Sequence, residues 1–207
     1  MRKLALLFLL FAFFLLMGQA QAGPGFVGGD LENNAIRLEQ NIGEDLGSLG
    51  SRPLPQLRKD AQQALARKDP KAALNPLAAI VAANPKDAGA WLSYSRAAID
   101  AAGYDETLKE NATAAAFLAY KRASGKAEQA VALAWLGEVF VRRSMWRPAI
   151  DAYRASLDRA DIAQVRNIYE DLREKHGFRI LNYKVDNESA SPRVCFQFFR
   201  ASRSSHR

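Results

Sequence analysis

The spacing of apolar residues between about residues 54 and 176 is the feature that most constrains how this chain can fold. Alanine, leucine and aromatic residues recur there at intervals of three and four, which predicts amphipathic helices. The pattern is clearest in LAWLGEVFVRRSMWRPAIDAYRASL, where Leu133, Leu136, Gly137 and Phe140 mark one helix and Ala149, Tyr153 and Ser156 mark the next. A small residue at Gly137 would let the two helices approach closely, with Phe140 and Tyr153 filling the space around that contact.

This pair resembles the tetratricopeptide repeat, in which 34 residues form two antiparallel helices. Two earlier copies align with it. The first has Leu57, Ala61 and Ala64, then Ala73, Leu77 and Ile80, and ends at Pro85; the second has Trp91, Tyr94, Ser95 and Ala98, then Ala116, Tyr120 and Ala123. The second copy aligns only with about eight extra residues, which we expect around residues 103–111. A terminal helix over residues 161–176 would follow, apolar at Ile162, Val165, Ile168, Tyr169 and Leu172.

We therefore predict a mainly α protein in which residues 54–177 form antiparallel, tetratricopeptide-like helix pairs of an α-solenoid. A generic helical bundle is the alternative. In such an array the first helices of successive pairs line a concave surface. The side chains expected to face it are Arg58, Gln62, Arg96, Glu138 and Arg142. They suit a protein or peptide partner with some acidic character, although a solvated helix surface would have the same composition.

The amino terminus reads as an export signal. Arg2 and Lys3 precede an apolar run of 14 residues, LALLFLLFAFFLLM, which is shorter than the roughly 20 residues that span a bilayer as a helix. Ala20 and Ala22 then supply the small residues that signal peptidase requires. We expect residues 1–22 to be a signal peptide cleaved after Ala22, with the mature protein in the periplasm and in contact with the membrane only before cleavage; an uncleaved anchor is the alternative.

Residues 23–53 are expected to be a linker with one short helix. Their GPGFVGG stretch has the letters of a phosphate-binding loop but follows a cleavage site rather than a strand. Asp30 can cap a helix whose apolar residues would be Leu31, Ala35, Leu38 and Ile42, and GSLGSRPLP would end it.

Charge and motifs favour neither nucleic-acid binding nor catalysis. The formal net charge is +7, but Arg2 and Lys3 lie in the signal peptide and four further arginines follow the last acidic residue, Glu188. The rest of the chain is nearly neutral, so no basic patch is expected on the fold. No nucleophile elbow, phosphate loop or ligand-spaced His/Cys cluster is present in the sequence. We therefore expect a protein that is not an enzyme and uses no cofactor or metal.

The carboxyl-terminal stretch changes from helical to alternating spacing. Leu181, Tyr183 and Val185 alternate with polar residues, and Val194, Phe196 and Phe198 alternate again after Pro192, which predicts two strands within residues 178–199. A basic, serine-rich tail occupies residues 200–207. The single cysteine, Cys195, falls on the second strand, as a small buried side chain or as a thiol whose partner is elsewhere.

The signal peptide, the helical repeats and then FRILNYKVDNESASPRVCFQF resemble the amino-terminal end of bacterial alpha-2-macroglobulin-like proteins. The resemblance implies that the strands open a macroglobulin-type β-sandwich. It also implies a protease-trapping family, but Cys195 is followed by Phe-Gln-Phe and no Cys-x-Glu-Gln thioester motif occurs in the sequence. We expect an exported, non-catalytic interaction module. A reading frame that ended early or shifted would produce the tail after Phe199, and so would a divergent natural terminus.

The alternative is a free-standing periplasmic repeat adaptor that binds a peptide or an envelope protein. The DNA beyond the stop codon separates the two hypotheses. An overlapping frame that encodes more β-sandwich would support the first, and its absence would support the adaptor.

Overall fold

The computed structural model describes residues 29–44, 46–177, 179–186 and 193–199. Within these ranges the chain is mainly helical and ends in a two-stranded antiparallel sheet, as predicted. The helices are α2 (Gly29–Glu44), the 3-10 helix η1 (Gly47–Ser51), α3 (Leu54–Ala66), α4 (Pro70–Ala83), α5 (Ala88–Ala102), α6 (Glu106–Arg122), α7 (Lys126–Arg142), α8 (Trp146–Leu157) and α9 (Ala163–His176). The strands are β1 (Arg179–Asp186) and β2 (Arg193–Phe199). The predicted signal peptide, with Ala20 and Ala22, and the basic tail lie outside the described residues.

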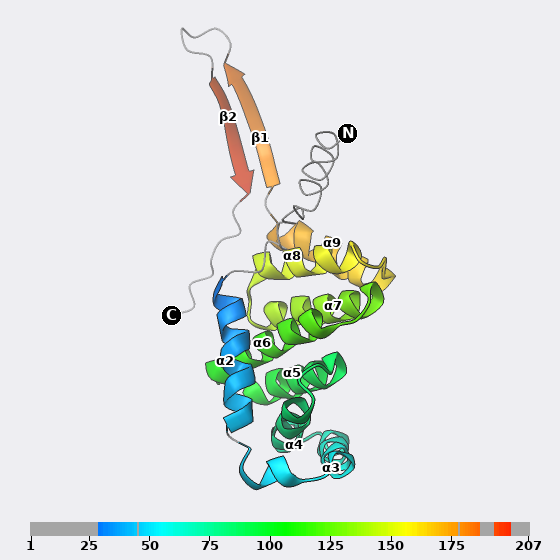
Figure 1. Cartoon of the computed structure of the whole chain (residues 1–207). Coiled ribbons are helices and arrows are strands. Elements are labelled where there is room, and N and C mark those ends of the chain that lie inside the picture. The colour runs from blue at the N-terminus through cyan, green and yellow to red at the C-terminus, as the bar shows by residue number, and fades with distance from the viewer. Residues whose placement is uncertain (1–28, 45, 178, 187–192, 200–207) are drawn as a thin grey trace, which may run out of the picture.

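Helices α3 to α9 stack in chain order, each packing against the next, and α3/α4, α5/α6 and α7/α8 form the three predicted pairs (Figure 1). Three of these helices have an aspartate as their N-cap residue. Asp69, Asp87 and Asp105 each accept a hydrogen bond from a backbone N–H in the first turn of α4, α5 and α6, at 2.9, 2.9 and 3.1 Å. These caps satisfy N–H groups that have no partner within a helix. No helix among the described residues has both the length and the apolar character needed to cross a bilayer.

The turns inside the first and third pairs have the same hydrogen-bonded geometry. The Asp69 N–H bonds to the Ala64 carbonyl at 3.0 Å, and the Met145 N–H bonds to the Phe140 carbonyl at 2.8 Å. In both turns the preceding residue, Lys68 or Ser144, has φ of 57°, the left-handed conformation that closes a helix. Ala64 and Phe140 occupy equivalent positions in the predicted repeats, so the backbone repeats as the side-chain pattern does.

The extra residues of the second repeat are not in an inserted loop. We expected them around residues 103–111, but only Gly103, Tyr104 and Asp105 separate α5 from α6. The helices are longer instead: α5, α6 and α7 have 15, 17 and 17 residues, against 13 and 14 in α3 and α4. Asp105 caps α6 after a turn of three residues, as Asp69 caps α4, so the two turns have equal length and the extra residues lie in the helices.

The core follows the predicted spacing. Every predicted position on the first helix of each pair is buried. On the second helices Tyr120 and Ala123 are half-buried, while the other predicted positions are buried. In the terminal helix Val165 and Leu172 are buried. A Cβ atom at Gly137 would lie 3.0 Å from three ring carbons of Tyr153, so this glycine sits against the face of the tyrosine ring.

Helix α2 packs across the array, mainly against α6 and also against α4, and in Figure 1 it runs along the side of the stacked helices. Its buried residues are the four predicted apolar ones, Leu31, Ala35, Leu38 and Ile42. Glu39 also forms an ion pair with Arg122 of α6 at 3.0 Å. The helix thus contributes to the core of the array.

Strands β1 and β2 form a hairpin that projects away from the helices (Figure 1). Tyr183 pairs with Phe196 and Val185 with Val194, so these four side chains share one face, and all four are exposed. Cys195 is also exposed and is a free thiol, so it is not the buried side chain that one of our hypotheses assumed.

Candidate functional site

The five residues predicted to face the concave surface lie on the first helices of the three pairs. Arg58 and Gln62 are on α3, Arg96 is on α5, and Glu138 and Arg142 are on α7. Glu138 is half-buried and the other four are exposed. We call this side of α3, α5 and α7 the first-helix face.

Two of the predicted arginines converge on a tryptophan that the sequence analysis did not single out. The guanidinium carbons of Arg96 and Arg142 lie 5.1 and 5.4 Å from the ring centroid of Trp135. Both distances suit cation–π contact. Arg96 comes from α5, whereas Trp135 and Arg142 come from α7, so the contact joins two successive repeats.

The Trp135 ring is held by a hydrogen-bond chain. Its Nε1 donates to Ser95 Oγ at 2.8 Å, and Ser95 Oγ donates to the Ala112 carbonyl at 2.7 Å. Ser95 is fully buried, so this chain satisfies a buried hydroxyl and fixes the edge of the indole at the same time. The half-buried tryptophan is therefore a rigid platform between α5 and α7.

Of the two arginines beside Trp135, only Arg142 is paired with carboxylates among the described residues. Arg142 bonds to Asp100 Oδ1 at 2.6 Å and to Glu138 Oε1 at 3.0 Å. Burial alone would lower the pKa of Arg142, but the hydrogen bonds to Glu138 and Asp100 outweigh it and raise the pKa. Arg96 forms no ion pair with the described residues. We call Arg96, Asp100, Trp135, Glu138 and Arg142 the Trp135 cluster.

Glu138 also links the cluster to the helix contact at Gly137. Tyr153 OH donates to Glu138 Oε2 at 3.3 Å. Burial and, to a lesser degree, the nearby Glu138 carboxylate raise the pKa of Tyr153, so its hydroxyl stays protonated well above neutral pH. The carboxylate thus has partners on α7 and α8, which limits its rotamers.

Arg58 and Gln62 are not part of this group. They lie on α3, which packs on α4 and has no substantial contact with α7 in the described chain. Sequence reasoning missed Trp135 and Asp100. An off-core tryptophan next to Leu136, and an aspartate four residues after Arg96 on the same helix, were the available signals.

The cluster combines a flat aromatic surface, one cation that has no carboxylate partner among the described residues, and one cation already neutralised. His176 is remote from it, at the end of α9, where its ring stacks on Trp146 with centroids 4.0 Å apart. Among the described residues no three His, Cys, Asp or Glu side chains are placed to hold a metal ion. A comparison with known protein families finds no family model that matches the chain, and no curated protein matches it.

Proposed function

We propose that this protein is an exported, non-catalytic helical-repeat module that binds a protein or peptide partner on its first-helix face. The observation that supports this most directly is the Trp135 cluster, in which three of the five predicted residues meet around one half-buried aromatic ring. Aromatic and arginine side chains are enriched at the energetic centres of protein interfaces. A surface that served only solubility would not need to fix a tryptophan by two successive hydrogen bonds.

The partner that fits best is an extended segment with an acidic residue. Arg96 offers its guanidinium without an ion pair in the described chain, and it is oriented by the Trp135 ring. An acidic side chain would complete a charge-assisted hydrogen bond there. The neighbouring Arg142 is already paired with Asp100 and Glu138, so it would contribute packing contacts to the site rather than a charge for the partner.

Peptide display followed by calorimetry tests the proposal. Peptides selected on the full mature chain should be extended and contain an acidic residue, and Arg96→Glu should weaken their binding at least tenfold, because losing a charged hydrogen bond costs about 1.5–3 kcal/mol. Lys71→Glu makes the same charge change on α4, a second helix, and is the matched control. Equal loss in both variants, or none in either, would contradict binding at the first-helix face.

Two contexts for this module follow from the sequence. In the first, the chain is the amino-terminal part of a protein that resembles the bacterial alpha-2-macroglobulin-like inhibitors. In the second, it is a free-standing periplasmic adaptor. The exposed apolar face of the β1–β2 hairpin favours the first, because two strands alone do not make a stable sheet in water.

A further inference from the structure

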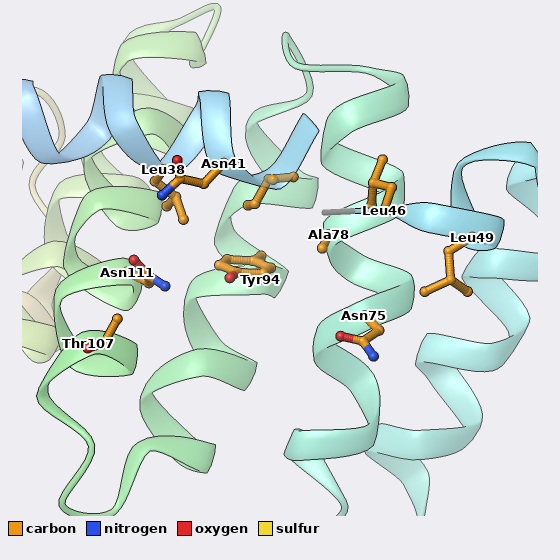
Figure 2. A pocket seen from close by; sticks show the side chains of 10 residues that line it. Leu38, Asn41, Leu46, Leu49, Asn75, Ala78, Tyr94, Thr107 and Asn111 are labelled. Atoms are coloured by element: carbon orange, nitrogen blue, oxygen red, sulfur yellow. The ribbon is translucent and has the colours of Figure 1, made fainter. Parts of the chain in front are cut away.

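A cavity of about 360 Å³ lies where α2 crosses the array. Its walls come from α2, η1, α4, α5 and α6, which places it on the side of the second helices rather than on the first-helix face (Figure 2). The volume is at the small end of the roughly 300–1,000 Å³ that is typical of small-molecule sites.

Five neutral polar side chains surround this cavity: Asn41, Asn75, Tyr94, Thr107 and Asn111. None of them makes a hydrogen bond through its side chain with a described residue. They come from four different helices, and no charged residue lines the cavity. Asn41, Asn75 and Thr107 are exposed, Asn111 is half-buried and Tyr94 is buried. The cavity is thus lined by neutral amide and hydroxyl groups that can bond to water or to a ligand.

Tyr94 is the most informative of the five. It is only 6% exposed, and its ring meets the Trp91 ring edge-on, with centroids 6.4 Å apart. Trp91 is itself fixed by a 2.9 Å hydrogen bond from its Nε1 to the Pro85 carbonyl. Figure 2 shows Tyr94 among the lining side chains, with its hydroxyl on the side of Asn111 and Thr107. Burial raises its pKa, so the hydroxyl is a neutral donor.

The tyrosine ring is buried, but its hydroxyl is open to the cavity, because no buried side-chain nitrogen or oxygen among the described residues lacks a hydrogen-bond partner. The hydroxyl therefore keeps its access to water in the cavity. It is also free to bond to a molecule that replaces this water.

We propose that this cavity binds a small neutral ligand rich in hydroxyl groups, of the size of a mono- or disaccharide. Asparagine amides and hydroxyl groups can both donate and accept hydrogen bonds. Each sugar hydroxyl does the same, so the two sets of groups are complementary. The apolar side chains of α2, including Leu38 and Ile42, offer a surface for the C–H face of such a ligand. The absence of a charged side chain from the lining disfavours ionic ligands. This site is separate from the Trp135 cluster and does not depend on the proposed protein-binding role.

Nuclear magnetic resonance titration of the full chain tests the proposal, with glucose, N-acetylglucosamine, maltose and trehalose as neutral probes and glucuronate as a charged one. At least one neutral sugar should saturably shift the side-chain amide signals of Asn75 and Asn111, and glucuronate should bind more weakly. Tyr94→Phe should weaken that sugar about three- to tenfold, the loss of one neutral hydrogen bond. The melting temperature of this variant should stay equal to that of the parent or rise.

Tyr104→Phe removes the same atom from a fully exposed tyrosine in the α5–α6 turn and should leave sugar binding unchanged. The proposal fails if none of the sugars gives saturable shifts, which would mean that the cavity holds only water. It also fails if Tyr94→Phe binds as the parent does, or if N-methylacetamide displaces the sugar at equal concentration, since the site would then recognise amides rather than hydroxyl groups.

Discussion

The contact between Gly137 and Tyr153 sets how closely α7 and α8 pack. Helix propensity alone would make Gly137→Ala neutral or slightly stabilising, because alanine is the better helix former. With three ring carbons 3.0 Å from the new Cβ, and with the ring buried and bonded to Glu138, the tyrosine has little room to move.

Gly137→Ala should therefore destabilise the protein by about 1 kcal/mol, and Gly137→Leu by about 1–3 kcal/mol, because both overpack this contact. Urea unfolding followed by circular dichroism measures both. Gly43→Ala is the matched control, since a Cβ there meets nothing within 4 Å, and it should stabilise by about 0.5 kcal/mol. A Gly137→Leu variant as stable as the parent would show that α7 and α8 do not meet at this residue.

Ser144 occupies a backbone conformation that suits glycine, with φ of 57°. Ser144→Gly should stabilise the protein by about 0.5 kcal/mol, because relief of the left-handed strain exceeds the added chain entropy of the unfolded state. Ser93→Gly makes the same change inside α5 and should destabilise by a similar amount. Thermal unfolding of the two variants should move in opposite directions, and a shift in the same direction would refute this account of the turn.

The raised pKa of Tyr153 predicts how stability depends on alkaline pH. Below pH 10 the tyrosine is protonated in both states, and its contribution to stability is fully present. As the pH rises above the unfolded-state pKa of about 10, the unfolded chain releases this proton while the folded protein still holds it, so stability falls. Between pH 9 and 11 the free energy of unfolding should fall less steeply in Tyr153→Phe than in the parent. Identical slopes in the variant and the parent would contradict the assignment.

At the scale of elements, the β1–β2 hairpin is the part least involved in the packed array. Its strands contact chiefly each other, and its exposed apolar face holds Tyr183, Val185, Val194 and Phe196. Deleting residues 182–207 should change the unfolding free energy of the helices by less than about 1 kcal/mol and raise the solubility, because exposed aromatic strands promote association. Unfolding of the helices on deletion would instead show that the hairpin is integral to the domain.

The sequence predicted which face of each helix is buried, but not how all the helices are arranged in space. The interval of three and four located Leu57, Trp91 and Leu133 in the core because burial on one helix face is a local property of the sequence. The same interval found the apolar residues of α2 but could not say that this helix crosses α4 and α6, since that contact joins distant segments. The alignment of the second repeat gave about eight extra residues around residues 103–111, but it could not show whether they form a loop or lengthen a helix. Residues 106–111 belong to α6.

For the whole molecule, the site was predicted in part. The repeat phase placed Arg96, Glu138 and Arg142 on one side, and the structure brings them together because successive first helices lie next to each other. It did not identify Trp135, whose role depends on a hydrogen bond to Ser95, 40 residues earlier in the chain. Arg58 and Gln62 occupy the equivalent positions of the first repeat, but they lie on α3, which does not pack against α7 in the part of the chain that the structure describes. Position within a repeat does not reveal which helices are in contact.

The central claim is that a partner binds at the first-helix face, and site-specific photo-crosslinking in the native cells tests it most directly. A photoreactive phenylalanine analogue in place of Val131, an exposed residue of α7 one turn before Trp135, leaves Arg96 intact. It should crosslink to one discrete partner, and the yield should fall when a display-selected acidic peptide is added to the permeabilised cells. The same analogue at Lys71, an exposed residue on α4, should not crosslink to that partner. A partner that crosslinks at position 71 and not at position 131, or a yield at position 131 that the peptide leaves unchanged, would contradict the account.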